Sequence, residues 1–307
     1  MAQKRSDQGT GVALGLGAYF LWGILPLYFK LVGQVPAVEI VADRVIWSVL
    51  FLAGLVTLRR RWSAIRTALG TGRVLLILIA TAGLIAANWL IYIWAIVNGH
   101  ILAASLGYYL NPLVNVLLGV IILKEKLTRG QLAAVLLAAI GVAVLAFGAG
   151  ASLWISLSLA LSFGLYGFVR KVTPVDSLEG LAIETAILAP LSLGYLLWAH
   201  PGLSGLAAYD MTTNTLLIVG GALTAIPLLL FNAAAKRLPY STLGFLQYLA
   251  PTLQFLIAVA VYGEVLTIAH MVCFAAIWTA LAIFAGEGLR VGRARARAAE
   301  ACAEPCP

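Results

Sequence analysis

Ten long apolar stretches, separated by short polar breaks, constrain this chain more than any other feature. Each stretch is close to the ~20 apolar residues that a helix needs to cross the hydrocarbon core of a bilayer. With 62% hydrophobic and 10% charged residues among 307, little length is left for a soluble domain. The sequence therefore predicts an all-α integral membrane protein with ten transmembrane helices. We expect them at residues 10–32, 36–58, 74–97, 101–123, 129–148, 152–169, 179–199, 213–235, 240–262 and 267–289.

The basic residues predict how the chain is oriented. Cytoplasmic loops of membrane proteins carry an excess of Lys and Arg. When the N-terminus is placed inside, the inside segments hold every Lys and Arg except Lys30 and Arg44, which fall within predicted helices, and the outside loops hold none. We therefore expect a multi-pass protein of the bacterial cytoplasmic (inner) membrane with both termini in the cytoplasm. Basic residues at one membrane face attract anionic lipid, so the net charge of +8 does not indicate a nucleic-acid partner.

Two segments of the chain repeat one another. The sequence S-L-G-Y-Y-L-N-P-L-V-N at 105–115 resembles T-L-G-F-L-Q-Y-L-A-P-T-L-Q at 242–254, and after a two-residue insertion the registers agree at an offset of 139. The motif E-x-L-T, whose threonine suits a helix N-cap, recurs at 125–128 and 264–267. The chain is therefore predicted to contain an internal repeat.

Each repeat contains five of the predicted helices, so the second repeat must enter the membrane upside down. We expect a first repeat at 9–148, an inverted second repeat at 152–289 and a cytoplasmic tail at 290–307. Inverted repeats are typical of secondary transporters, because the two halves can favour inward and outward openings of similar energy. The repeat therefore indicates transport by alternating access.

The repeat also carries a family resemblance. The paired halves, each with L-G, a mid-helix proline and a terminal E-x-L-T, resemble the EamA repeat of the drug/metabolite transporter superfamily. Within it, A-Y-F-L-W-G-I-L-P-L-Y-F-K at 18–30, V-P-A-V-E-I-V-A-D-R-V-I-W-S at 35–48 and N-W-L-I-Y-I-W-A at 88–95 are similar to the RarD permeases, a group named for chloramphenicol sensitivity. With the repeated segments, the resemblance covers nearly the whole chain except its termini. It implies a ten-helix inner-membrane permease with a central cavity and does not name a substrate.

Four ionisable side chains lie deep in predicted helices, where such groups are costly. Glu39, Asp43 and Arg44 lie on the second predicted helix, and Glu184 reaches a comparable depth on the seventh. Arg44 follows Pro36 by eight residues, which places it about 12 Å into a core roughly 30 Å thick. Two interpretations are open. Arg44 pairs with Asp43 or Glu184 as a clamp between the halves, or it binds an anionic group of the substrate while a carboxylate titrates.

Polar and aromatic residues on several predicted helices are candidates for a cavity lining. Pro112 and Pro251 match in the repeat, and each should kink its helix beside a polar face. Interhelical hydrogen bonding is the alternative role for such polar groups. Lys30 shares a helix face with Trp22 and either snorkels to water or contacts the substrate. The candidates for substrate binding or translocation are Arg44, Asp43, Glu39, Glu184, Asn115, Gln254, Tyr108, Gln247, Asn88, Tyr92, Trp22 and Lys30.

Several function classes find no support in the motifs. The sequence has no G-x-x-x-x-G-K segment that would bind ATP phosphates. The three His residues lack local metal-ligand spacing and the three Cys residues indicate no disulfide framework, so no metal or cofactor is predicted. The predicted function is a secondary transporter of a small organic solute, such as a drug or an amino-acid-like compound, and not an enzyme. A lipid flippase and, more remotely, an intramembrane enzyme are the alternatives, and the sequence does not indicate an oligomeric state.

Overall fold

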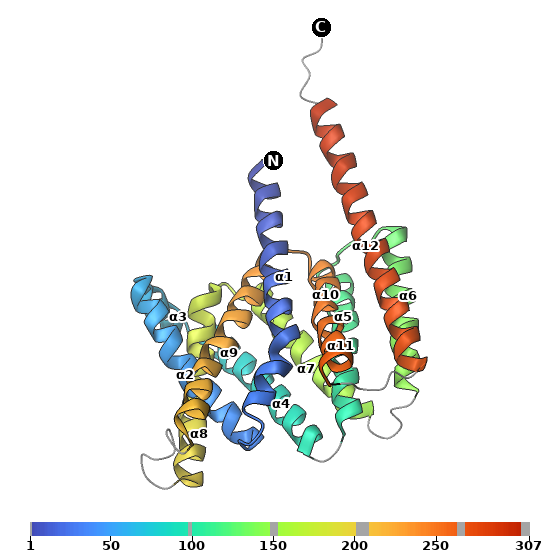
Figure 1. Cartoon of the computed structure of the whole chain (residues 1–307). Helices are drawn as coiled ribbons and strands as arrows, with labels where there is room; N and C mark the ends of the chain where they lie inside the picture. Colours follow the sequence, from blue (N-terminus) through green and yellow to red (C-terminus); the bar gives the residue numbers. More distant parts are fainter. Residues whose placement is uncertain (1, 98–99, 148–152, 201–208, 263–267, 302–307) are drawn as a thin grey trace.

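The computed structural model describes residues 2–97, 100–147, 153–200, 209–262 and 268–301 (Figure 1). This part of the chain folds into twelve α-helices and contains no strand, so the protein is all-helical as predicted. The helices are α1 (Ala2–Leu31), α2 (Ala37–Leu58), α3 (Trp62–Gly70), α4 (Gly72–Val97), α5 (Ile101–Ile121), α6 (Arg129–Ala146), α7 (Leu153–Val172), α8 (Ser177–Ala199), α9 (Met211–Arg237), α10 (Tyr240–Gln247), α11 (Leu249–Tyr262) and α12 (Ile268–Ala301).

Nine of the predicted stretches coincide with single helices, and the stretch 240–262 is split into α10 and α11 at Tyr248. The last helix, α12, continues to Ala301, beyond its predicted end at residue 289. Within the described residues, seven helices are long and apolar enough to cross a membrane, and α5 and α6 contain shorter apolar segments. These properties indicate an integral membrane protein with several spans. The predicted motif at 264–267 lies outside the described residues.

The helix α3 was not predicted, because it lies within the Arg-rich segment 59–73. Ile65 and Ala68, three residues apart, are buried, whereas Trp62 and Arg66 are exposed. This spacing gives a short amphipathic helix with one face on the bundle. A window long enough to detect a membrane span cannot detect such a helix.

The helix α9 begins where its first free backbone N–H groups find an acceptor. Asp210 precedes the helix, and its carboxylate accepts hydrogen bonds from the backbone N–H groups of Thr212 at 3.0 Å and Thr213 at 3.2 Å. The Thr213 hydroxyl also donates to this carboxylate, and these bonds hold the pKa of Asp210 below its ordinary value. An aspartate at this position therefore stabilises the helix start.

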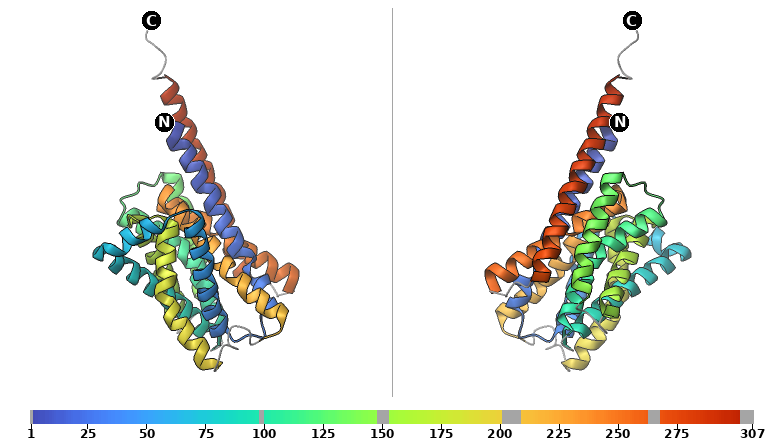
Figure 2. Two further views of the ribbon diagram at one scale, coloured as in Figure 1. Left: turned by 90° about the vertical axis from the view of Figure 1, so that its left-hand side faces the viewer. Right: turned by 90° about the vertical axis from the view of Figure 1, so that its right-hand side faces the viewer.

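Both termini leave the helix bundle at the same end, which we call the terminal end (Figures 1 and 2). The start of α1 and the last turns of α12 project beyond the other helices there. The turn between α1 and α2, residues 32–36, lies at the opposite end (Figure 1). The helix α1 therefore runs the full height of the bundle.

Helices from the first half of the chain pack against helices from the second half throughout the bundle. The helix α6 packs against α12, α5 packs against α7 and α10, and α1 packs against α9 and α11. In the same way α2 packs against α8 and α9, and α4 packs against α7 and α8. Figure 1 shows α6 and α12 together at one side of the bundle and α3 at the other. The two halves are therefore interleaved.

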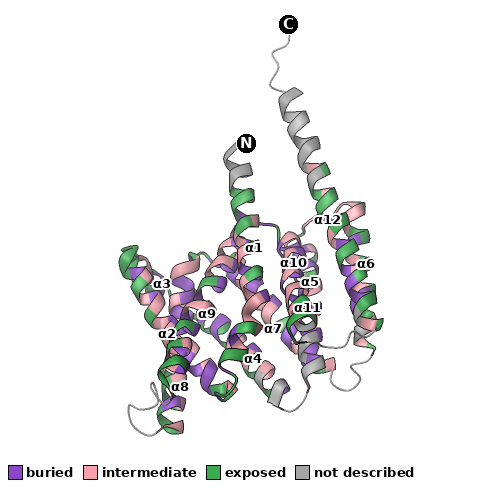
Figure 3. Cartoon of the chain, in the orientation of Figure 1, coloured by how far each residue is buried: buried purple, intermediate pink, exposed green. Residues whose placement is uncertain are grey.

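Many large apolar side chains are exposed on the helices, whereas several polar and charged side chains are buried. Figure 3 shows where the exposed and buried residues lie along the helices. Leu191 and Trp198 are 76% and 78% exposed, while Asn115, Arg170 and Glu184 are at most 1% exposed. Such a distribution is unfavourable in water. It is favourable in lipid, where polar groups must find their partners inside the protein.

The helices α2 and α9 approach closely because α9 presents two glycines to α2. A Cβ on Gly221 would lie 2.5 Å from the carbonyl carbon of Trp47, and Ser48 Oγ donates to the Gly221 carbonyl at 2.9 Å. A Cβ on Gly220 would lie 3.4 Å from Arg44 Cγ. The Arg44 side chain therefore lies along α9, in space that small residues leave open.

Candidate functional site

A cavity of about 520 Å³ lies between the helices. Its volume is within the ~300–1,000 Å³ range of small-molecule sites. Gly33 and Val35 of the α1–α2 turn belong to its lining, so the cavity reaches the end of the bundle opposite the termini (Figure 1). Toward the terminal end the lining stops at Tyr19 on α1, Ile85 on α4 and Phe163 on α7. These three residues form the floor of the cavity.

Arg44 is the one charged side chain that the structure places in this lining, within the described residues. Its Nε donates a hydrogen bond to Thr224 Oγ1 at 2.6 Å, and the Thr224 hydroxyl donates to the Gly220 carbonyl at 2.7 Å. The guanidinium carbon lies 5.3 Å from the ring centre of Phe29 and 6.0 Å from that of Trp89. No Asp or Glu in the described part of the chain lies within ion-pair distance of Arg44.

Aromatic rings form much of the remaining wall. Trp22 of α1 and Phe163 of α7 meet edge to face, with ring centres 5.7 Å apart. Tyr92 of α4 and Tyr108 of α5 meet in the same geometry at 5.7 Å. Edge-to-face pairs hold the rings in fixed orientations. The wall is therefore rigid and predominantly apolar.

Amide side chains in the lining are engaged with the protein on one side. Asn88 Nδ2 donates to Ser162 Oγ at 2.9 Å. Gln254 Nε2 donates to the Trp22 carbonyl at 3.1 Å, and Gln247 Oε1 accepts from Asn115 Nδ2 at 2.7 Å. These hydrogen bonds join neighbouring helices beside the cavity and orient the amides. Both roles considered from the sequence, interhelical bonding and cavity lining, therefore fall on the same side chains.

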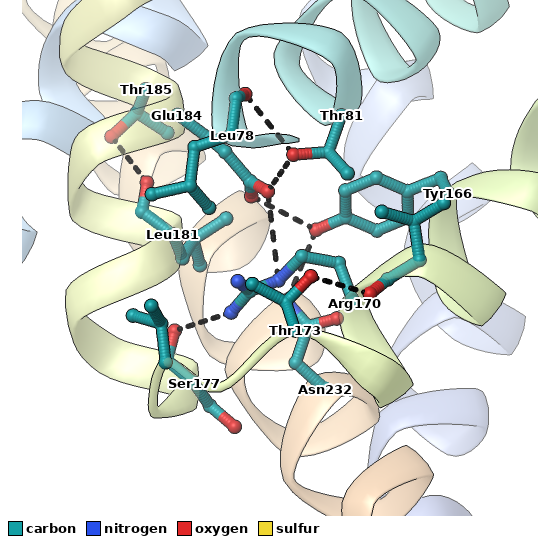
Figure 4. A network of polar contacts seen from close by, with 12 residues as sticks. Leu78, Thr81, Tyr166, Arg170, Thr173, Ser177, Leu181, Glu184, Thr185 and Asn232 are labelled. Carbon is teal, nitrogen blue, oxygen red and sulfur yellow. Dashed lines mark hydrogen bonds and ion pairs between the residues drawn. The ribbon is translucent and has the colours of Figure 1, made fainter. Parts of the chain in front are cut away.

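A buried arginine, Arg170, lies outside the cavity, between α4, α7, α8 and α9 (Figure 4). Arg170 Nε lies 3.5 Å from Glu184 Oε1, and both side chains are buried. Thr81 Oγ1 donates to Glu184 Oε1 at 2.5 Å, and the Tyr166 hydroxyl donates to Glu184 Oε2 at 3.3 Å. Asn232 Nδ2 donates to the Tyr166 hydroxyl at 3.0 Å. We call these five residues the Arg170–Glu184 network.

The Arg170–Glu184 network lies directly behind the cavity floor. Thr81 precedes the floor residue Ile85 by four positions on α4, and Tyr166 follows the floor residue Phe163 by three positions on α7. Both steps are about one helical turn and lead toward the terminal end. The network therefore belongs to the closed side of the bundle and not to the cavity.

The structure corrects the pairing predicted as one interpretation for Arg44. Glu184 pairs with Arg170, and Arg44 forms an ion pair with neither Glu184 nor Asp43. The sequence placed Arg170 in a cytoplasmic loop, because the predicted helix ended at residue 169, whereas α7 continues to Val172. An error of three residues at a helix end thus concealed the partner of Glu184.

The sequence contains one signal for this pairing, at Gly180 in the first turn of α8. A Cβ on Gly180 would lie 2.0 Å from Arg170 Nη1. The guanidinium therefore occupies space that any other residue would fill. A glycine near the start of a helix has several explanations, however, and does not by itself reveal what lies against it.

The structure divides the other predicted site residues into two groups. Those in the cavity lining are Trp22, Arg44, Asn88, Tyr92, Tyr108, Gln247, Pro251 and Gln254. Those outside the lining are Lys30, Glu39, Asp43, Pro112, Asn115 and Glu184. Glu39 accepts hydrogen bonds from His200 Nε2 at 2.9 Å and from the Tyr209 hydroxyl at 2.6 Å. Asn115 is fully buried behind Gln247.

Two residues that contact Arg44, Phe29 and Thr224, were not among the predicted site residues. Phe29 is one of many aromatic residues in the apolar stretches, and a single Thr in a membrane helix commonly bonds to its own backbone, as Thr224 does. Neither carries a distinctive signal in the sequence. Among the described residues, no group of three or more His, Cys, Asp or Glu side chains is placed to hold a metal ion.

Comparison with known proteins identifies the family. Residues 9–147 match the model of the EamA-like transporter family. Protein RarD of Escherichia coli K12 is 48% identical, over 95% of this chain and 99% of its own. The chain belongs to the EamA-like transporter family. An uncharacterized transporter of Vibrio cholerae is 46% identical over 97% of this chain and 99% of its own, and the chloramphenicol-sensitive protein RarD of Pseudomonas aeruginosa is 34% identical over 94% and 98%.

These relatives confirm the resemblance found in the sequence and make this EamA-like protein a multi-pass membrane transporter. A crystal structure of a more distant protein has the same fold, with a TM-score of 0.69 over 89% of this chain and 96% of that chain. At 21% identity, this likeness concerns the fold alone.

Proposed function

We propose that this transporter is a secondary transporter, or permease, that moves a small organic solute by alternating access. The observation that carries the proposal is the central cavity, which reaches one end of the bundle and stops at a floor of packed side chains toward the other. A solute in this cavity meets one side of the membrane only, as alternating access requires. The proposal covers both import and export, and drugs and amino-acid-like compounds are the solute classes to be tested.

Hydrogen bonds close the bundle on the terminal side of the cavity floor. The Tyr19 hydroxyl of α1 donates to the Leu243 carbonyl of α10 at 3.2 Å. The Tyr240 hydroxyl of α10 donates to the Gly164 carbonyl of α7 at 2.6 Å. Both tyrosines are fully buried. An opening of the terminal end must break these contacts, so they act as the inner gate in this proposal.

Charged groups nearer the terminal end add to the closure. Arg61 forms ion pairs with Asp176 at 2.5 Å and with Glu179, joining the segment between α2 and α3 to α8. Glu125 Oε2 accepts hydrogen bonds from Ser241 N at 2.9 Å and Ser241 Oγ at 2.6 Å, at the start of α10. A carboxylate at a helix N-terminus is stabilised by the helix dipole. The E-x-L-T glutamate Glu125 therefore stabilises the start of a helix from the other half of the chain.

The packing of the helices supports two inverted repeats at 9–148 and 152–289. Let α1, α2, α4, α5 and α6 correspond to α7, α8, α9, α10–α11 and α12. Each contact between the two halves named above then has a counterpart. The contact of α1 with α9 corresponds to that of α7 with α4, and α2 with α9 corresponds to α8 with α4. The pairs α2–α8, α5–α10 and α6–α12 correspond to themselves. Such pairing is expected of a twofold repeat and supports ten spans, with α10 and α11 as one broken span.

In this proposal both termini are cytoplasmic, and the cavity opens to the outside. Reporter fusions after residues 34, 99, 150, 205 and 265 should report an extracytoplasmic location, and those after 65, 126, 173, 237 and 295 a cytoplasmic one. The distribution of Lys and Arg gives the physical reason. If two well-expressed fusions reported the opposite side of the membrane, the ten-span topology would be wrong.

Arg44 has the central role in the proposed site, as the cation for an anionic group of the solute. Its lack of a carboxylate partner within the described residues supports this role. The lining amides Asn88, Gln247 and Gln254 would orient the solute, and Trp22 would form its wall. The predicted candidates outside the lining would act only by holding helices in place.

Metabolite profiling followed by flux measurement tests the proposal. Cells that lack or overproduce the protein should differ in the level of at least one small solute. Proteoliposomes containing the purified protein should show saturable flux of that solute, and a cysteine in the lining should be labelled from one side of the membrane at a time. Simultaneous access from both sides would indicate a channel, and protein-dependent lipid scrambling without solute flux would indicate a flippase.

A further inference from the structure

The charge of the cavity lining indicates what the solute carries. Arg44 is the lining's only ionised side chain in the described ranges, and no acidic residue there belongs to the lining. Glu39 and Glu184 both have partners of their own outside the lining. A cation without a counterion inside a membrane protein is costly, and a bound anion removes that cost.

The surroundings of the guanidinium leave one edge free for the anion. Phe29 and Trp89 lie near the guanidinium at 5.3 and 6.0 Å, and Thr224 occupies Nε. The Nη1 and Nη2 groups remain without a protein acceptor among the described residues. A guanidinium presents its N–H donors in one plane, in a fork that matches the two oxygens of a carboxylate. A carboxylate therefore fits this edge better than a spherical anion.

The cavity walls beside this edge of the guanidinium suit a solute whose uncharged part is flat. The rings of Trp22 on α1 and Phe163 on α7 meet edge to face. The rings of Tyr92 on α4 and Tyr108 on α5 meet in the same way. Aromatic rings interact with unsaturated rings by stacking and edge contacts in addition to the burial of apolar area. A saturated body of the same size gains the burial and lacks the ring contacts.

Within the described residues, the same lining has no acidic side chain that would balance the charge of an ammonium group. Its amides are neutral and offer an ammonium only their carbonyl oxygens. An amine on the solute would therefore lie in a cavity whose charged group, Arg44, has the same sign. Like charges in a site of low dielectric repel strongly.

We infer that the solute is an organic monoanion, a carboxylate on a flat unsaturated body, bound at the free edge of Arg44, and that cations and zwitterions are rejected. The inference rests on the proposed function, because it assigns a substrate class to the transport cavity. It narrows the proposal by setting amino acids aside and retaining acids that lack an amino group.

A set of five related probes tests the substrate class on the unmodified protein. Phenylacetate carries the anion and the ring, phenylacetamide is its neutral counterpart, and phenylglycine adds an ammonium group. Phenethylamine carries only the cation, and cyclohexylacetate keeps the anion on a saturated ring. Calorimetric titration of the purified full-length protein in detergent should show phenylacetate binding about 10- to 100-fold more tightly than phenylacetamide, since a hydrogen-bonded charge is lost. Phenylglycine and phenethylamine should bind more weakly still, and cyclohexylacetate should fall between phenylacetate and phenylacetamide.

Variants then connect the selectivity to Arg44. Arg44→Gln should remove the preference for phenylacetate over phenylacetamide, and Arg44→Lys should keep part of it. Arg66→Gln is the matched control, because Arg66 is an exposed residue of α3 and its loss changes the net charge equally. Absence of phenylacetate binding, equal binding of phenylglycine, or an unchanged preference in Arg44→Gln would each overturn the inference. If a variant fails to fold, the comparison of the five probes on the unmodified protein still tests the substrate class.

Flux measured beside binding separates this inference from the proposed function. Selective binding of phenylacetate with no saturable flux of any bound acid would contradict transport and leave the anion site intact. Saturable flux of a cation or a zwitterion that Arg44→Gln does not change would contradict the substrate class and leave transport intact. Selective binding together with flux of phenylacetate, lost in Arg44→Gln, supports both.

Discussion

Arg44 of α2 and Arg170 of α7 both lie inside the helix bundle, and their surroundings differ. Arg170 is fully buried, pairs with Glu184 at 3.5 Å, and its Nη2 lies 3.4 Å from the Asp176 carbonyl and 3.5 Å from that of Ser177. Arg44 lines the cavity between aromatic rings, and within the described residues it has one hydrogen bond, to Thr224. The first arginine is enclosed by the protein, and the second faces a space that a solute can enter.

The comparison distinguishes a charge that holds the fold from a charge that is available for binding. A buried ion pair whose partners stay together is part of the closed side of the bundle. An unpaired cation beside a cavity raises the free energy of the empty protein, and a bound anion removes this cost. We therefore expect substitutions of Arg170 to act on stability and substitutions of Arg44 to act on binding.

The largest effect is expected from Arg170→Met, which leaves Glu184 buried without its cation. Breaking a buried ion pair by removing one partner costs about 3–5 kcal/mol. Thermal unfolding in detergent and the amount of protein in the membrane should both fall clearly. Arg44→Gln should change neither by a comparable amount, because it leaves no carboxylate unpaired.

The double variant Arg170→Met with Glu184→Gln is the control for this prediction. Since the second change removes the unpaired charge, it should restore most of the lost stability. A double variant as unstable as Arg170→Met alone would show that the guanidinium matters through packing and not through its pairing with Glu184.

Much of the fold could be predicted from the sequence, because a long apolar stretch is enough to identify a membrane-spanning helix. The alternation of basic loops predicts an orientation in the membrane, which stays a prediction. The short helix α3 and the break at Tyr248 escaped prediction, since neither changes the apolar length of a segment. Local polarity is therefore a strong signal for spans and a weak one for their internal geometry.

The site was predictable only as a set of candidates. Depth and polarity singled out Glu184, which is buried, and Arg44, which is half-buried in the cavity lining, but their partners depend on how each helix is rotated. Rotation is set by packing between distant parts of the chain, such as the contact of Gly221 with α2. This is also why Asn115 and Gln254, matched in the repeat, differ in the structure: Gln254 lines the cavity and Asn115 lies behind it.

A smaller loss of stability is expected from Gly180→Ala. The new methyl group would meet the Arg170 guanidinium at 2.0 Å, and the buried side chain has little room to move. Overpacking of this kind costs about 1–3 kcal/mol. Gly194→Ala, on the same helix with no atom within 4 Å of the new methyl, should be neutral or slightly stabilising, and the two melting temperatures should therefore differ. Equal behaviour of the two variants would mean that Arg170 is not held against α8.

Cysteine labelling should separate the cavity from the enclosed side. In a Cys-free background, Gln254→Cys should react with small polar maleimides because Gln254 lines the cavity. Asn115→Cys should resist, since Asn115 is fully buried, and Leu256→Cys should resist because its exposed side faces lipid. The rates are measured by mass shift. Labelling of Asn115→Cys as fast as Gln254→Cys would place the enclosed side in the solute pathway as well.

The smallest effect is expected from Thr224→Val, which removes the acceptor for Arg44 Nε and keeps the guanidinium charge. The Thr224 oxygen holds the guanidinium at 2.6 Å, so its loss should let the free edge rotate away from the bound carboxylate. The affinity for phenylacetate should fall by about 0.5–1.5 kcal/mol, the net contribution of one hydrogen bond. Thr215→Val is the matched control, because Thr215 lies on the same helix, is exposed, and bonds only to the Met211 carbonyl within the described residues. If both variants weaken phenylacetate equally, Thr224 does not orient Arg44. If only Thr224→Val does, and its melting temperature is unchanged, the loss lies in binding, as expected for the arginine that faces the cavity.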